Sequence, residues 1–218
     1  MTAPAPATAK DSGPSIAFNL GAIALIVAVA GLGLAYAIDA AGRMPSEAGA
    51  PVTRTLGGEA LTIPASWLRE DTERSEGFAK QVELGLTLPL GPDAAPREID
   101  VTLLPRSRVR PSSSLLDGVY LHQFMPEQLT GPPGLIGKPL VATEGYANET
   151  VWYDAINASP FVAKCIAPVA EGQASRCIRT VYLGPGIAAV YSFDEDVLAN
   201  WRKFDAALDV PLKQIGAL

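Results

Sequence analysis

Residues 81–103, QVELGLTLPLGPDAAPREIDVTL, contain the clearest strand pattern in the chain. Between Val82 and Leu90 every second residue is valine or leucine, and the same alternation returns between Ile99 and Leu103 after the turn GPDAAP. Strict alternation is typical of strands with one buried face, and a turn rich in proline and glycine joins such strands into a hairpin. The stretch therefore predicts an antiparallel sheet that buries one of its faces.

Further strand patterns lie on both sides of this hairpin. VTRTL and EALTI flank Gly57-Gly58, a turn in which both residues tolerate positive φ, so we expect a second hairpin that ends at Pro64. Five more short apolar segments follow, separated by turn residues: KPLVAT, ETVWYDAI, FVAKCIAP, RCIRTVYL and IAAVYSF. Because neighbouring segments are joined by short turns, the predicted sheet is mainly antiparallel.

Two helices accompany the predicted strands. A capping-box pattern from Ser192 to Glu195 marks the start of a C-terminal helix, which the sequence predicts will pack on the sheet. Its apolar side chains follow helical spacing: Val197, Trp201, Phe204 and Leu208. The second helix, about 112–124, begins after Pro111. Strands grouped with helices on one face indicate an α+β domain.

An uncharged apolar segment precedes this domain. Residues 16–38, IAFNLGAIALIVAVAGLGLAYAI, are long enough at ~1.5 Å per residue to cross a hydrocarbon core of ~30 Å. We therefore expect a single transmembrane helix that remains as an anchor. The alternative is a secretory signal with Lys10 as its basic residue and cleavage after Ala35-Tyr36-Ala37. Both interpretations export the rest of the chain.

The anchor divides the chain into segments of different composition. Residues 1–15 lack large apolar side chains and are expected to be a disordered tail, 39–51 read as a linker, and 52–218 form the domain. We expect the amino terminus in the cytoplasm and the domain in the periplasm, which makes the chain a single-pass protein of the bacterial inner membrane. Without Lys10 and Asp11, the 17 basic and 23 acidic residues fall to 16 and 22, a net charge of −6. This charge argues against nucleic acid as a partner.

Small residues recur on one side of the predicted span. They follow one another at spacings of four and three: Ala17, Gly21, Ala24, Ala28, Gly31 and Ala35. Such a stripe lets a second helix approach closely, which would suit a membrane-protein partner or a homodimer as well as the surrounding lipid bilayer. The segment is rich in alanine and glycine throughout, so composition alone also explains the stripe.

Cys165 and Cys177 are the only two cysteines. If FVAKCIAP and RCIRTVYL form a hairpin in which the two cysteines are opposite, both sulfurs lie on one face at a distance that a disulfide tolerates. We therefore expect a disulfide, which would persist in the periplasm and rarely in the cytosol. The alternative is a pair of buried free thiols in a cytoplasmic domain.

Catalytic and cofactor motifs are sparse. His122 is the only histidine, and a hydrolytic triad would need it beside a serine of 112–114 and Asp117 or Asp154, yet no G-x-S-x-G motif is present. The two cysteines and one histidine lack the spacing of a zinc site. The loop GPPGLIGKPL at 131–140 lacks the hydroxyl residue and amide donors of a phosphate-binding loop. We therefore expect neither metal nor cofactor.

Arg106, Arg108 and Arg110 form the densest basic cluster. At a spacing of two they continue the solvent side of the strand that holds Asp100 and Thr102. They either cover a solvated strand face or form a docking patch for an acidic partner or anionic ligand, because arginine suits carboxylates and phosphates.

Several segments carry a family resemblance: LTIPASWLR, DVTLLPRSRVRPS, GVYLHQF, ETVWYDAI and PFVAKCIAP. They resemble single-pass membrane-anchored bacterial proteins of unknown function, over most of the chain including the anchor. The resemblance implies a Gram-negative inner-membrane setting and transfers no functional residues. The strand that ends in Ile63-Pro64, followed by Trp67, also resembles the entry to the PsbP-like α/β sandwich.

The hypothesis that follows is a membrane-anchored periplasmic interaction or assembly module without catalytic activity. Two alternatives stay open. One is a hydrolase-like enzyme centred on His122. The other is a carrier of a small apolar ligand, held between the sheet and the helix that contains Trp201 and Phe204.

Overall fold

The computed structural model describes residues 25, 28–33, 50–69, 77–142, 147–168, 170, 172–184 and 186–218. The chain divides into two units, Met1–Glu47 and Ala48–Leu218. In the first unit the described residues are helical and exposed, and the predicted tail and most of the predicted span lie outside the described part. Among the described residues no helix is both long and apolar enough to cross a membrane.

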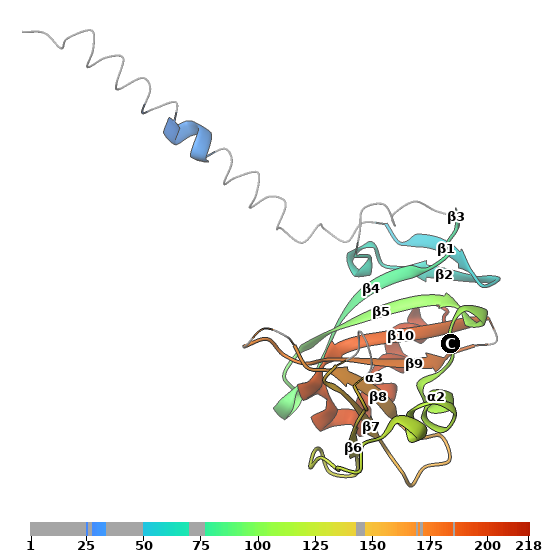
Figure 1. Cartoon of the computed structure of the whole chain (residues 1–218). Coiled ribbons are helices and arrows are strands. Elements are labelled where there is room, and N and C mark those ends of the chain that lie inside the picture. The colour runs from blue at the N-terminus through green and yellow to red at the C-terminus, as the bar shows by residue number, and fades with distance from the viewer. Residues whose placement is uncertain are drawn as a thin grey trace, which may run out of the picture. The chain divides into compact units, whose positions relative to one another are not determined.

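The second unit is built on a seven-stranded sheet (Figure 1). All of its strand pairs are antiparallel. In spatial order the strands are β4 (Val82–Leu88), β5 (Arg97–Pro105), β10 (Ile187–Asp194), β9 (Arg176–Tyr182), β8 (Val162–Ile166), β7 (Glu149–Tyr153) and β6 (Ile136–Pro139). The predicted α+β class with a mainly antiparallel sheet is therefore confirmed.

The predicted hairpin is formed by β4 and β5. Leu84 is paired with Val101 and Leu86 with Ile99, and all four side chains are buried. The turn between the strands contains the short 3-10 helix η3 (Pro92–Ala94). Alternation in the sequence thus identified both strands and the face that they bury.

A small second sheet has the order β2 (Glu59–Ile63), β1 (Val52–Leu56) and β3 (Gly77–Phe78). The predicted β1–β2 hairpin is confirmed, and both turn glycines have positive φ, +63° at Gly57 and +96° at Gly58. Gly57 also lies against the backbone of Gly186, whose carbonyl oxygen would be 2.6 Å from an added Cβ. A side chain at this turn would therefore force the two loops apart.

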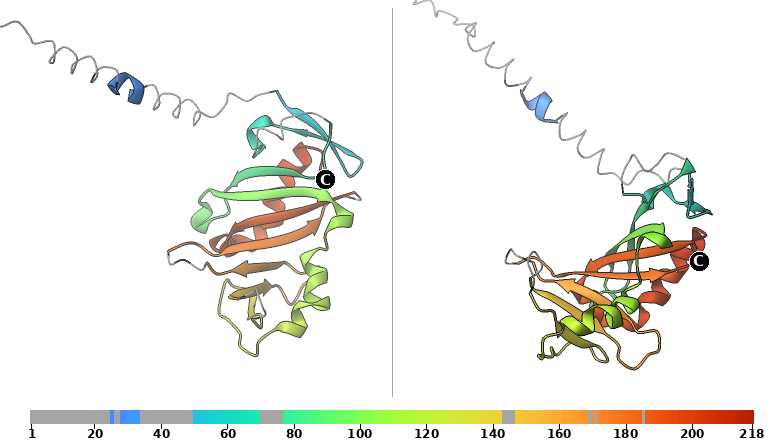
Figure 2. Two further views of the ribbon diagram at one scale, coloured as in Figure 1. Left: turned by 45° about the horizontal axis from the view of Figure 1, so that its top comes forward. Right: turned by 45° about the vertical axis from the view of Figure 1, so that its right-hand side comes forward.

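The C-terminal helix α3 (Trp201–Gln214) packs on one face of the large sheet, as predicted (Figure 2). The predicted helix start at Ser192 was wrong. β10 continues to Asp194, because Ser192 is paired with Ile178 of β9 on one side and with Asp100 of β5 on the other. The chain then forms the 3-10 helix η6 (Glu195–Asn200) before α3.

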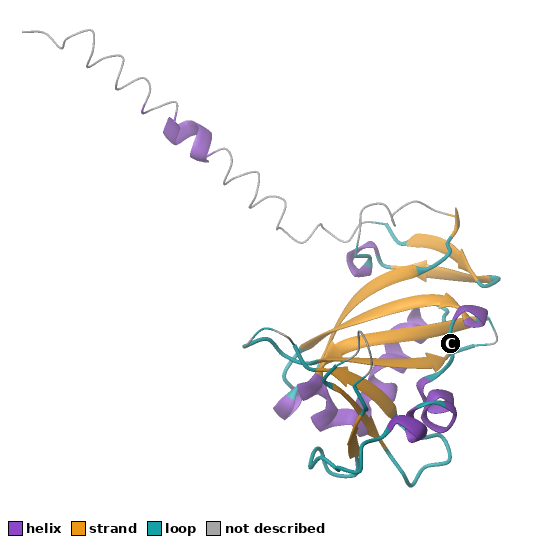
Figure 3. Ribbon diagram, in the orientation of Figure 1, coloured by secondary structure: helices purple, strands orange, loops and turns teal. Residues whose placement is uncertain are grey.

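The other predicted helix is shorter than expected. α2 spans Ser112–Gly118, and the chain continues as a separate 3-10 helix, η5 (Tyr120–Gln123) (Figure 3). The break follows Gly118, where glycine has low helix propensity, and Val119 leaves the helical region with a φ of −135°. The prediction of one helix over 112–124 was therefore wrong.

Two apolar clusters stabilise the domain. The larger lies between the sheet and α3, where the Phe204 ring contacts Phe161, Tyr191 and Phe193 at centroid distances of 5.9, 5.5 and 4.7 Å. Burial here raises the pKa of the Tyr191 hydroxyl above its ordinary value. The smaller cluster lies on the opposite face under α2 and η5 and contains Leu116, Leu140, Val151 and Val162, with Tyr120, Phe124 and Tyr153 at its border.

Candidate functional site

A cleft of about 340 Å³ lies between β4 and α3. Its sheet side is formed by residues 86–89, and Trp67, from the 3-10 helix η1 (Ala65–Trp67), lines it as well. Its helix side is formed by Ala207, Val210, Pro211 and Gln214. The lining is mostly apolar, which is typical of sites that bind an apolar side chain or ligand.

The cleft exists because β4 is the last strand of its sheet. The helix-side residues follow the spacing i, i+3, i+4 and i+7, so one stripe of α3 faces β4. Among the described residues no further strand of the large sheet lies beyond β4 to fill the space beneath this stripe. Val210 consequently remains 70% exposed, although its neighbours on α3, Leu208 and Leu212, are buried.

The sequence analysis did not single out this cleft as a site. An apolar pocket between the sheet and the helix that contains Trp201 and Phe204 was expected as one alternative, but none of the residues that line this cleft was named, and Phe204 itself is fully buried in the core. The corresponding signal in the sequence is the pair of consecutive apolar residues Val210-Pro211 in the last turns of α3. In the structure Val210 is exposed and Pro211 is buried. Helical periodicity alone did not reveal it, because the exposure of Val210 depends on where the sheet ends.

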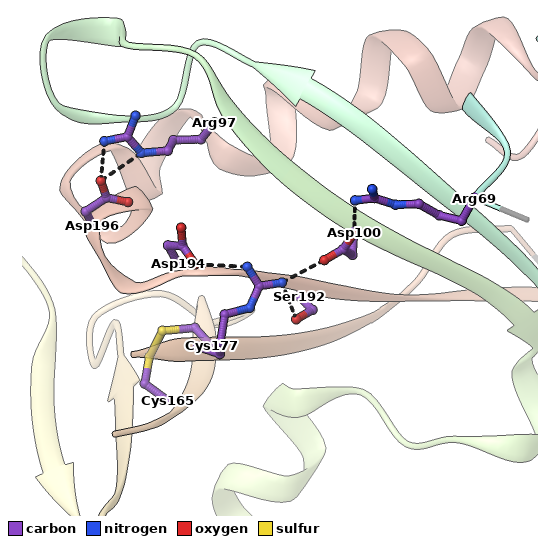
Figure 4. A network of polar contacts seen from close by, with 9 residues as sticks. Arg69, Arg97, Asp100, Cys165, Cys177, Ser192, Asp194 and Asp196 are labelled. Atoms are coloured by element: carbon purple, nitrogen blue, oxygen red, sulfur yellow. Dashed lines mark hydrogen bonds and ion pairs between the residues drawn. A yellow bond between two sulfur atoms is a disulfide. The ribbon is translucent and has the colours of Figure 1, made fainter. Parts of the chain in front are cut away.

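A network of ion pairs covers the opposite face of β5 and β10 (Figure 4). The carboxylate of Asp100 accepts hydrogen bonds from Arg69 and, at 2.7 Å, from Arg176. Arg176 also donates to Asp194 at 2.9 Å and to Ser192 at 3.0 Å. Each arginine already has carboxylate partners, so the network needs no anionic ligand to balance it.

Gly85 makes one arm of this network possible. An added Cβ at Gly85 would lie 2.8 Å from the Arg69 guanidinium, so the Arg69 side chain crosses β4 at the one position without a side chain. It reaches Glu98 at 2.6 Å and Asp100 on the neighbouring strand. Because Gly85 leaves room for it, the Arg69 side chain links the segment after η1 to β5.

The predicted disulfide is present between Cys165 and Cys177 (Figure 4). The two residues are direct partners in the β8–β9 register, and both side chains are buried in the cluster beneath α3. The neighbouring Arg179 is also buried, at 6% exposure, and was not predicted. Its guanidinium donates to both carboxylate oxygens of Asp205, at 3.2 and 2.8 Å, and so ties α3 to β9.

The arginine cluster has a different geometry from the one predicted. β5 ends at Pro105, and residues 106–108 form the 3-10 helix η4 (Arg106–Arg108), so the alternation does not continue. Arg106, Arg108 and Arg110 are all exposed. The Arg106 guanidinium stacks 3.9 Å above the ring of Tyr182, and Arg108 donates to the Lys80 carbonyl oxygen at 3.3 Å. Within the described ranges none of the three pairs with a carboxylate.

The candidate catalytic residues do not form a triad. Ser112 is buried, and its hydroxyl oxygen accepts a hydrogen bond from the Thr180 backbone N–H at 2.8 Å. His122 is exposed on η5, and across the residues that the structure describes no hydrogen bond joins its ring to a serine or carboxylate. The Asp154 carboxylate accepts a hydrogen bond from the backbone N–H of Ile156, two residues along the chain, at 3.1 Å. The described part of the chain also contains no cluster of potential metal ligands.

The glycine-rich loop at 131–140 has a packing role. Added Cβ atoms at Gly131 and Gly137 would lie 2.1 and 2.4 Å from the Trp152 ring, so both glycines make room for this indole. Lys138 donates to the backbone oxygens of Pro126 at 3.0 Å and Glu127 at 2.9 Å. These contacts explain Gly131, Gly137 and Lys138 without a nucleotide.

The predicted helix-packing stripe lies mostly outside the described residues. Ala28 and Gly31 are helical and exposed, and an added Cβ at Gly31 would meet no other atom within 4 Å. Ala17, Gly21, Ala24 and Ala35 are not described. Close helix packing through this stripe stays a prediction.

Comparison of the chain with protein-family models, with curated proteins and with solved structures found no match.

Proposed function

We propose that this chain is a non-catalytic interaction module of the bacterial inner membrane, anchored by residues 16–38 and facing the periplasm. The observation that carries the proposal is the apolar cleft between β4 and α3, where Val210 is 70% exposed at the open side of a well-packed domain. Exposed apolar surface beside a groove is characteristic of protein-binding sites. The anchor concentrates the domain at the membrane surface, where its partner would meet it.

The disulfide supports the periplasmic location. Cys165 and Cys177 are buried directly opposite each other on neighbouring strands. A disulfide at such a site persists in an oxidising compartment and is rarely kept in the cytosol. The argument is independent of the hydrophobic span.

The surroundings of His122 support an interaction function better than a hydrolytic one. The Ser112 hydroxyl is occupied by the sheet backbone, and the exposed His122 ring has no orienting carboxylate among the described residues. A triad needs a nucleophile, a base and an orienting group in contact. We therefore expect His122→Ala to leave the cellular function intact.

A photo-crosslinking residue at Val210 tests the interaction function in intact cells. We expect a reproducible adduct with one protein, identified by mass spectrometry. The matched control is the same residue at Ile156, which is 94% exposed, does not line the cleft, and follows β7 near the other edge of the sheet. Ile156 should give no such adduct. The absence of a protein adduct at Val210, or the same adducts at both positions, would contradict the proposal.

The same cleft supports a second function, the carriage of a small apolar ligand. Its volume of about 340 Å³ lies at the lower end of small-molecule sites. Native mass spectrometry of the purified full-length protein distinguishes the two functions. A co-purifying small molecule that Val210→Asp displaces would favour the carrier, whereas a mass equal to that of the protein alone would oppose it.

A further inference from the structure

The outer edge of β4 already accepts an extended segment of its own chain. Leu68 forms an antiparallel bridge with Leu84, and the Arg69 N–H donates to the Glu83 carbonyl oxygen at 3.2 Å. The bond shows that the backbone groups of Glu83 point away from β5. Since these groups alternate along a strand, those of Gly85 and Thr87 point outward as well.

Beyond the Leu68–Leu84 bridge this edge is open. In the described part of the chain no other backbone group bonds to the outward carbonyl of Gly85 or to the outward N–H and carbonyl of Thr87, and Thr87 is exposed. Unpaired groups on an edge strand are a template for a further strand. The open stretch coincides with the cleft, because residues 86–89 form the sheet side of the cleft.

The cleft would receive alternate side chains of such a strand. Directly opposed residues on neighbouring strands project to the same face of a sheet. Residues placed opposite Leu86 and Leu88 would therefore project toward α3, beside Val210 and Ala207. Residues placed opposite Thr87 would project to the other, solvated face.

A positive charge lies at one end of the cleft. Lys203 is exposed and stands one turn before Ala207 on the same side of α3. The Asn200 amide donates to the backbone oxygens of Leu90 at 3.3 Å and Gly91 at 2.6 Å, which holds the start of α3 beside the end of β4. Lys203 thus lies near the Pro89 end, and among the described residues it has no ion-pair partner.

We infer that β4 binds an extended segment of a partner protein as an additional antiparallel strand. Apolar residues at every second position of this segment fill the cleft, and an acidic residue at its amino-terminal end faces Lys203. The antiparallel direction follows the pairing of Leu68 with Leu84 and of β4 with β5. This inference rests on the proposed interaction function and specifies its partner. Main-chain hydrogen bonds supply affinity in this mode, and the alternate side chains supply specificity.

Peptide binding to the full-length protein in mild detergent tests the inference. The probe is the peptide Asp-Asp-Val-Thr-Val-Thr-Val-amide with fluorescein coupled to its amino terminus, followed by fluorescence anisotropy. Two N-methylated isomers serve as a matched pair. Methyl groups on the threonine amides remove the N–H groups that face β4, whereas methyl groups on the second and third valine amides remove N–H groups that face solvent. We expect the first isomer to bind at least tenfold more weakly than the second.

Two protein variants sharpen the result. Thr87→Pro removes the outward N–H but no bond to β5, so it should fold and should lose peptide binding at least tenfold. Lys203→Glu should weaken the binding of the acidic peptide and strengthen the binding of a peptide whose two aspartates are replaced by lysines. Circular dichroism checks that both variants keep the wild-type fold.

Equal binding of the two isomers, or no binding of the unmethylated peptide, overturns strand addition. The interaction function would survive this result if Val210 still forms its protein adduct in cells. If Val210 forms no protein adduct, the interaction function itself fails, whatever the peptides show.

Discussion

The two faces of the seven-stranded sheet are formed by alternate residues of the same strands, but they contribute differently to the stability of the domain. On β10, Tyr191 and Phe193 point to the face beneath α3 and are 2% and 0% exposed. Ser192 and Asp194 point to the other face, where both are half-buried; Arg176 donates a hydrogen bond to Ser192 and forms an ion pair with Asp194. The side chains of one face therefore form the main core together with α3. On the uncovered area of the other face the contacts are ion pairs and hydrogen bonds, which water weakens.

The difference also locates the candidate site. Apolar side chains beneath the middle of α3 are fully buried, whereas Val210, which lines the cleft at the end of the sheet, is 70% exposed. The exposed apolar residue is Val210 at the border between helix and sheet edge. The stability of the core and the proposed binding site thus involve the same helix at different positions along it.

Truncation of Phe204 should have the largest effect on stability. Phe204→Ala removes a fully buried ring that contacts three other aromatic rings, and we expect the free energy of unfolding to fall by about 3–5 kcal/mol. Chemical denaturation of the detergent-solubilised protein measures it. The matched control on the other face is Thr102→Ala, a half-buried residue of β5, with an expected loss below about 1 kcal/mol. Equal losses in both variants would contradict the proposed difference between the faces.

Removal of the disulfide should come second. In Cys165→Ala/Cys177→Ala the covalent link across 12 residues is lost, and we expect a decrease of about 3 kcal/mol, mainly because the unfolded chain gains freedom. Denaturant titration of the double variant and of the reduced wild type should give similar losses. Thiol labelling of the unreduced wild type under denaturing conditions should find no reactive thiol. Two labelled thiols per chain would refute the disulfide and remove its support for the periplasm.

The smallest effect is expected on the uncovered face. Asp100→Asn weakens the pairs with Arg69 and Arg176, whose side chains are 36% and 45% exposed. Arg69 keeps Glu98 and Arg176 keeps Asp194, so the expected loss is below about 1 kcal/mol. It should shrink further in 1 M salt, where the Debye length is about 3 Å. A loss comparable to that of Phe204→Ala, or one that salt leaves unchanged, would mean that this network supports the fold as strongly as the core.

Several features could be predicted because neighbouring residues in the chain determine them. The alternation around Leu84 and Val101 identified two strands, and the spacing of Cys165 and Cys177 identified their register and bond. The helical spacing of Phe204 and Leu208 identified the face of α3 that packs on the sheet. Each pattern repeats over a few residues, so local geometry was sufficient.

Other features could not be predicted because distant residues compete for the same backbone. Ser192 matched a helix cap, but pairing with strands on both sides kept it in β10. The arginines after Pro105 matched a continued strand, but the Arg106 N–H bonds to the Gly186 carbonyl oxygen and the chain turns into η4. The sequence excluded a phosphate-binding loop at 131–140 but did not show that Gly131 and Gly137 make room for the ring of Trp152.

The sequence by itself determined the α+β class, the strands with a buried face, the packing face of the last helix and the pairing of the two cysteines. These follow from side-chain periodicity and short-range spacing, which a linear pattern records. Only the tertiary structure decided that β4 ends the large sheet, that Val210 stays exposed beside it, and that Arg69 crosses Gly85 to reach Asp100. These features depend on contacts between residues far apart in the chain, and their distances are set by how the elements pack rather than by the pattern within any one of them.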